Sequence, residues 1–191
     1  MSDIEKLAKE ADERMSKYIQ KCGDQLKVDK AYVDYVAQSS VAYVIDSGCQ
    51  NLVYIHKGNI MTLKPGNIFI DLKGTLTAAL EVFTGYQNPV NIFGMLQLIF
   101  LIIFSIKDVI NVKLPKGTET VIITLYKNDG FVKAIDEEKL FRETKLSLNV
   151  GESLNKKQFS DIILFLDKYH VIECIDGTIQ LKEKVFGKDF I

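Results

Sequence analysis

The spacing of apolar residues predicts two helices in the first 50 residues. Over 2–22 these residues recur every three or four positions, as on one face of an amphipathic helix. Ser2 and Glu5 would form a capping box at its start, and Gly23 would end it. A second helix is expected over about 29–47, although its later part, VAYVI, could instead be a strand.

The pattern changes to strands and tight turns over 51–72. The runs LVYIHK and IMTLK flank the Gly-Asn pair at 58–59, which suits a two-residue type II′ hairpin turn. The Pro-Gly pair at 65–66 marks a second turn before NIFIDL. Together these runs predict a small β-meander. A short helix capped by Thr75 is expected over 75–86, because an Asn-Pro pair follows it.

The segment Ile92–Ile106 contains no charged residue. As a helix it would span about 22 Å, whereas a bilayer core is about 30 Å thick. We therefore expect a helix buried in a protein core or a subunit interface, with Phe100, Ile103 and Phe104 as candidate apolar interface residues. Insertion into a membrane remains an alternative.

The Pro and Gly residues of KLPKG (113–117) mark a domain boundary. We expect a helical N-terminal domain with the β-meander over 1–114, and a second domain over 115–191. The order of elements expected in the second domain is a helix at about 119–127, a strand over FVKAI, a helix capped by Asp136, a helix at about 156–169 with Asn155 and Gln158 as its capping box, and a hairpin.

The final hairpin has the clearest local pattern in the chain. VIECI and TIQLK flank Asp176-Gly177, a dipeptide typical of type I′ turns. A two-residue turn pairs Cys174 with Ile179, and the strand alternation predicts that both side chains face the core.

The stretch QFSDIILFLDKYHVIECIDGTIQLKEKV (158–185), with the elements before it, resembles the winged helix-turn-helix superfamily over about 117–185. The resemblance lies in the pattern of elements and in no diagnostic motif. It implies an α+β protein with a winged-helix-like C-terminal domain. Members of that superfamily often bind DNA through the third helix and the wing, and many others bind proteins, so the fold alone assigns no function.

The outward face of the predicted third helix therefore becomes the candidate contact surface. A helix that reads DNA usually presents Arg, Lys, Asn or Gln, whereas this face has an acid and a leucine near its centre. An exposed leucine would gain from burial in a protein contact. The candidate contact residues on this helix and the wing are Lys157, Ser160, Asp161, Leu164, Lys168 and Lys182.

Composition excludes several other classes. The chain has 24 Lys+Arg and 25 Asp+Glu, so it lacks the basic excess typical of nucleic-acid binders. Three widely spaced cysteines predict neither a disulfide framework nor a zinc site. The charged first 22 residues do not resemble a secretory signal, which favours the cytoplasm.

No motif of nucleotide, hydrolase or metalloprotease chemistry occurs in the sequence. We interpret His56, His170 and the carboxylates at 136–138 as structural, and Asp71 as a very weak catalytic candidate.

We therefore expect a non-enzymatic interaction subunit or adaptor of a multi-protein assembly, without cofactor or metal, that binds a protein partner or a second copy of itself. One alternative is a DNA-binding transcriptional regulator that uses helix 156–169 and the wing at 171–182. Another is a membrane-associated accessory protein inserted through 92–106.

Overall fold

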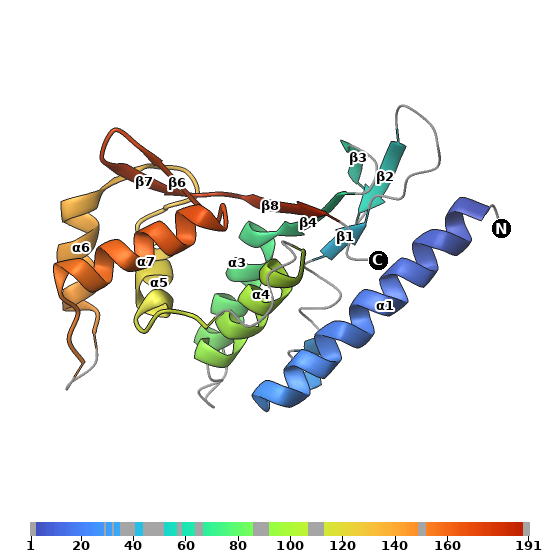
Figure 1. The fold of residues 1–191 in the computed structure, drawn as a ribbon, viewed down its shortest axis with the longest axis horizontal. Coiled ribbons are helices and arrows are strands. Elements are labelled where there is room, and N and C mark those ends of the chain that lie inside the picture. The colour runs from blue at the N-terminus through green and yellow to red at the C-terminus, as the bar shows by residue number, and fades with distance from the viewer. Residues whose placement is uncertain are drawn as a thin grey trace. The chain divides into compact units, whose positions relative to one another are not determined.

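The computed structural model describes residues 3–28, 30–31, 33–34, 41–43, 52–56, 59–63, 67–85, 92–106, 113–148 and 152–188. They form helices and small antiparallel sheets, so the predicted α+β class is confirmed. The chain divides into two compact units (Figure 1). Unit 1 comprises Met1–Ile110 and Lys184–Ile191, and unit 2 comprises Asn111–Glu183.

Unit 1 begins with α1 (Asp3–Leu26), which runs past the predicted stop at Gly23. The helix ends instead at Lys27, whose φ of 56° is left-handed, and Val28 N–H donates to Gly23 O at 3.0 Å. A Cβ on Gly23 would lie 2.3 Å from Cγ2 of Val33. Glycine therefore serves close packing here, and the prediction that it ends the helix is wrong. Ser2 lies outside the described residues.

The second predicted helix gives way to a strand. Residues 30, 31, 33 and 34 are helical, but β1 (Val41–Tyr43) is extended, as the alternative for VAYVI allowed. The other residues of 35–47 lie outside the described part of the chain. Strand β1 pairs antiparallel with β4 (Asn67–Asp71), which pairs on its other side with β8 (Lys184–Lys188). Ile70 and Val185 face each other in this sheet, and both are fully buried.

The predicted meander is split between two sheets. β2 (Leu52–His56) and β3 (Asn59–Leu63) form an antiparallel pair of their own, while β4 joins β1 and β8. His56 pairs with Asn59, so Asn59 is a strand residue and the predicted placement of the turn at 58–59 is wrong by one residue. Residues 57–58 and the predicted turn at 65–66 lie outside the described residues.

Helix α3 (Leu72–Gly85) follows β4 directly and starts three residues before the predicted helix. Its cap is Asp71, whose Oδ1 accepts a hydrogen bond from Gly74 N–H at 2.9 Å. Thr75 lies within the first turn and donates its hydroxyl to Asp71 O at 2.7 Å. The prediction that Thr75 caps this helix is therefore wrong. The Asn-Pro pair at 88–89 lies outside the described residues.

Helix α4 has the predicted bounds, Ile92–Ile106. It packs against α1, α3 and β8 within unit 1. Its buried side chains point in several directions around the helix, as expected for a core helix; they are Leu96, Leu98, Ile99, Phe100, Ile103 and Phe104. Among the helices that the structure describes, none has both the length and the apolar character needed to cross a membrane.

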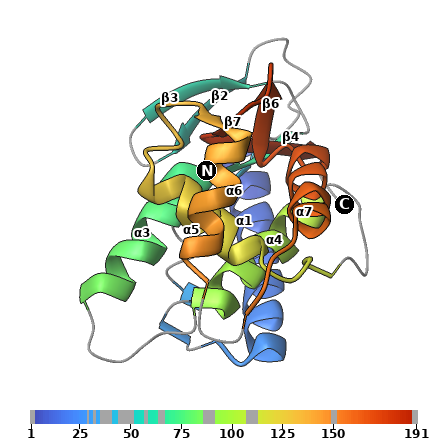
Figure 2. The same cartoon turned by 90° about the vertical axis from the view of Figure 1, so that its left-hand side faces the viewer.

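Unit 2 contains three helices and a three-stranded sheet in its described residues, and Figure 2 shows α5, α6 and α7 grouped beside the β6–β7 hairpin. The antiparallel strands have the order β5-β7-β6. The predicted strand FVKAI is largely a turn, and only Ile135 of it is extended. The elements are α5 (Thr118–Lys127), β5 (Ile135–Asp136), α6 (Glu137–Leu146), α7 (Lys156–Lys168), β6 (Ile172–Ile175) and β7 (Thr178–Leu181).

The division of the chain differs from the expected one at its C-terminal end. The units separate between Ile110 and Asn111, close to the predicted boundary at 114/115. However, the last residues, from Lys184 onward, return to unit 1 because β8 pairs with β4. Unit 2 is therefore inserted between α4 and β8. Because β4 and β8 lie more than 100 residues apart in the sequence, no local pattern predicts that they pair.

We expect Gly23→Ala to lower the free energy of unfolding by about 1–3 kcal/mol, the usual range for overpacking. Helix propensity alone predicts the opposite change in stability, because it favours alanine over glycine by about 1 kcal/mol. Urea unfolding measures the change.

Val33→Ala removes the two methyl groups that a Cβ at position 23 would meet, so Gly23→Ala should destabilise the chain much less in that background. Gln25→Ala, on the exposed side of the helix, is the control and should change the stability little. A stabilised Gly23→Ala chain would contradict the close packing.

Candidate interaction surface

Helix α7 is held at its start by the predicted capping box. The Asn155 side chain accepts from Gln158 N–H at 2.8 Å, and Gln158 Oε1 accepts from Asn155 N–H at 2.9 Å. The helix then buries Phe159, Ile162, Ile163 and Leu166 in unit 2. The ring of Phe159 lies against that of Phe141 on α6, with centroids 5.1 Å apart. The buried face of α7 thereby determines which side chains remain outside.

The opposite face of α7 is exposed, as predicted. Residues 157, 161, 164 and 168 follow one another at spacings of four, three and four, which places them on one stripe of the helix. Leu164, near its middle, is 67% exposed. The predicted contact residues Lys157, Ser160, Asp161, Leu164 and Lys168 are all exposed.

Positive charge is not concentrated on this surface. Helix α7 carries three lysines and two aspartates, and residues 171–182 carry one lysine, one glutamate and one aspartate. Lys182 Nζ lies 3.2 Å from Glu173 Oε1, so the one lysine of the wing segment is paired. Lys168 Nζ lies 5.6 Å from the ring centroid of Tyr169. Cations and anions are therefore equal in number over α7 and the wing.

The β6–β7 hairpin has the predicted turn and register. Asp176 and Gly177 have φ of 48° and 74°, both left-handed as a type I′ turn requires, and Cys174 pairs with Ile179. Ile179 is buried, but Cys174 is exposed, so its predicted place in the core is wrong. The cause is the strand order: β7 lies between two strands, whereas β6 is an edge strand and only Ile172 of it is buried.

Two features of this hairpin were not predicted from the sequence. Ile175, beside the turn, is 57% exposed and adds a second apolar side chain to the hairpin. Partial burial raises the pKa of the Cys174 thiol, and the carboxylates of Asp167 and Glu137 raise it further. A raised pKa keeps the thiol protonated, which is the less nucleophilic form.

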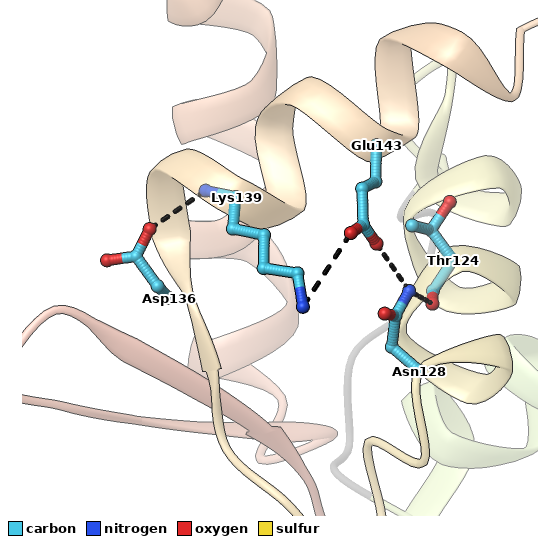
Figure 3. A network of polar contacts seen from close by, with 5 residues as sticks. All are labelled: Thr124, Asn128, Asp136, Lys139 and Glu143. Carbon is cyan, nitrogen blue, oxygen red and sulfur yellow. Dashed lines mark hydrogen bonds and ion pairs between the residues drawn. The ribbon is translucent and has the colours of Figure 1, made fainter.

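A polar network joins α5 to α6 (Figure 3). Asn128 Nδ2 donates to Thr124 O at 3.0 Å and to Glu143 Oε2 at 2.6 Å, and Lys139 Nζ lies 3.8 Å from Glu143 Oε1. Asp136 accepts from Lys139 N–H at 2.8 Å and so caps α6, as predicted. These contacts cap α6, join the end of α5 to α6 and pair two side chains along α6, so the network is structural.

The other chemical candidates also have structural contacts. Glu138 forms an ion pair with Lys156, and Glu137 N–H donates to Gly177 O at 3.0 Å. His170 follows α7 with a left-handed φ of 57°, and Asp71 caps α3. Among the residues that the structure describes, no group of three or more His, Cys, Asp or Glu side chains could hold a metal ion.

The predicted apolar interface residues lie inside unit 1. Phe100, Ile103 and Phe104 are 1%, 0% and 2% exposed, and the two phenylalanine rings are 5.9 Å apart. Side chains already covered by their own chain have almost no area left to bury against another subunit. The structure therefore accounts for them as core residues of α4.

The start of unit 2 contains an unfavourable carboxylate. Oε2 of Glu119, in the first turn of α5, is buried without a hydrogen-bond partner among the described residues. Burial raises the pKa of Glu119, its own backbone N–H lowers it, and the nearby charge of Glu152 raises it. Gly117 N–H and Lys116 lower it by smaller amounts. The net shift is upward, so folding disfavours the ionised form.

This shift predicts how stability depends on pH. Between the ordinary glutamate pKa and the raised one, the native chain holds a proton that the unfolded chain releases, so stability falls as pH rises through that window. Glu119→Gln should therefore raise the melting temperature at pH 7 and give no gain below the ordinary glutamate pKa. Thermal melts of both chains across this range measure it.

Glu137→Gln, in the first turn of α6, is the matched control and should give no such gain, because an acid there favours the helix dipole. A Glu119→Gln chain less stable than the parent at pH 7 would contradict the unfavourable burial.

No model of a known protein family, no curated protein and no solved structure matches this chain.

Proposed function

We propose that unit 2 is a winged-helix-like interaction module and that the protein is a non-enzymatic, cytoplasmic adaptor of a multi-protein assembly. The element order α5-β5-α6-α7-β6-β7 and the strand order β5-β7-β6 support this resemblance, with α7 as the third helix and the β6–β7 hairpin as the wing. In this proposal the exposed face of α7 contacts another protein.

The observation that carries the proposal is the exposed Leu164 near the middle of the outer stripe of α7. Single exposed apolar residues are common on proteins. Here, however, the leucine lies on a regular stripe, flanked by Asp161 and Lys168, on a helix whose other face is fixed in the core. An apolar centre with a polar rim is the usual composition of a protein interface.

The charge balance favours a protein over DNA. Binding to a phosphate backbone depends on an excess of Lys and Arg, whereas cations and anions are equal in number over α7 and the wing. Asp161 would also lie against phosphates or base edges if α7 entered a groove. The DNA-binding alternative depends mainly on Lys157 and Lys168, because Lys182 is paired with Glu173.

The same stripe also suits a second copy of itself in one arrangement. Two parallel copies would place each lysine against its equivalent, but antiparallel copies aligned with Asp161 opposite Lys168 would bring the two Leu164 side chains together. We therefore propose a protein partner for this face, either a different chain or a second copy of this one.

The test is a tagged pull-down from the native host with nuclease added. A stoichiometric partner retained by the parent chain should be lost or weakened at least about fivefold by Leu164→Asp, since loss of an anchor residue at an interface costs about 1 kcal/mol or more. Leu146→Asp is the matched control, because Leu146 is also an exposed leucine at 86%. Equal retention by both variants would refute the role of Leu164.

The DNA alternative predicts a different result. If α7 reads DNA, the parent chain should bind duplex fragments of the host genome at low salt, with affinity falling steeply as salt rises. Lys157→Glu with Lys168→Glu should abolish that binding, whereas Leu164→Ala should not. Salt-dependent binding with this mutational pattern would replace the adaptor proposal by the regulator.

A further inference from the structure

The C-terminal strand β8 belongs to unit 1 although the chain reaches it only after unit 2. Each residue of β8 pairs with one of β4, from Lys184 opposite Asp71 to Lys188 opposite Asn67. Val185 and Ile70, paired at this edge, are fully buried. Unit 1 therefore completes its sheet with a segment that residues 107–183 separate from α4.

The junction between the two units at this end is one residue long. Lys182 N–H donates to Val171 O at 2.9 Å, so residue 182 is still bonded within unit 2. Lys184 is already paired with Asp71 in unit 1. Only Glu183 lies between Lys182 and Lys184. When unit 2 is folded, β8 is therefore joined to it by a single residue.

The physical consequence lies in the entropy of loop closure. When unit 2 is unfolded, docking β8 on β4 closes a loop of 77 residues, 107–183. A folded unit 2 holds its first and last residues at a fixed separation, so docking of β8 costs far less chain entropy. Each doubling of a flexible loop lowers the equilibrium constant for closing it about threefold. If a folded unit 2 acts as a loop of about ten flexible residues in place of 77, docking is favoured about twentyfold.

We propose that β8 is a latch whose closure on unit 1 is controlled by the folding of unit 2. A partner that stabilises unit 2 then also favours docking of β8, and by linkage the docked strand stabilises unit 2 in return. The effect reaches the start of α3, because Lys184 pairs with Asp71, the cap of that helix. This coupling requires the covalent connection alone, and it holds whether the partner of α7 is a protein or DNA.

The experiment lengthens the junction in the full chain and follows amide hydrogen exchange. A flexible Gly/Ser segment of about 20 residues inserted between Glu183 and Lys184 should lower the protection of the β8 amides roughly five- to tenfold. The same segment inserted between Asp176 and Gly177, at the hairpin tip, is the matched control and should leave β8 protected, since it does not lengthen the connection.

Exchange in α7 reports that unit 2 stays folded in both insertions, and exchange in α1 reports unit 1. Insertions of about 5, 10 and 20 residues at the junction should lower the protection of the β8 amides progressively. If the longest insertion disrupts folding, the chain with the shortest insertion is compared with the parent. β8 protection that does not depend on insertion length, or that falls equally with the hairpin-tip insertion, would overturn the latch.

Discussion

Unit 2 depends on the burial of one face of α7. Phe159, Ile162, Ile163 and Leu166 are buried in this unit, and the contact between the rings of Phe159 and Phe141 holds α6 against α7. Burial of four such side chains stabilises the unit by about 6–12 kcal/mol before the entropy of folding is subtracted. Because this face of α7 is buried, the stripe through Leu164 on the opposite face is exposed.

Predictions from the sequence were best where the signal was local. The bounds of α4 followed from a strongly apolar run without charged residues, and the capping box of α7 and the turn at Asp176-Gly177 followed from short motifs. The exposed face of α7 followed from helical periodicity. These features depend on residues within a few positions of one another.

Predictions failed where distant residues decide the outcome. Gly23 is a packing contact because of Val33, Cys174 is exposed because β6 is an edge strand, and residues after Lys184 belong to unit 1 because their partner is β4. The sequence pattern predicts Thr75 as the cap of α3, because the aspartate that fills this role, Asp71, is the last residue of the preceding strand. In the candidate site, periodicity predicted the helix face, and strand alternation, which places Ile175 on the face of β6 opposite Cys174, is the local signal that indicates its exposure.

The two units have different roles in this account. Unit 2 presents the face of α7 and the hairpin, while unit 1 encloses the apolar helix α4 and receives β8 from the far end of unit 2. In the proposed latch, the inserted arrangement links partner binding at α7 to the sheet of unit 1 through the stability of unit 2. The proposed adaptor would then respond to its partner through the chain connection alone.

Site-specific photo-cross-linking in the native host tests most directly whether Leu164 on α7 contacts a protein partner. A photoreactive residue replaces Leu164 in one full-length chain and Leu146 in another, and adducts are identified by mass spectrometry. We predict one dominant protein adduct from position 164 and none of that protein from position 146. Cross-linking of position 164 to DNA, or equal adducts from the two positions, would contradict it.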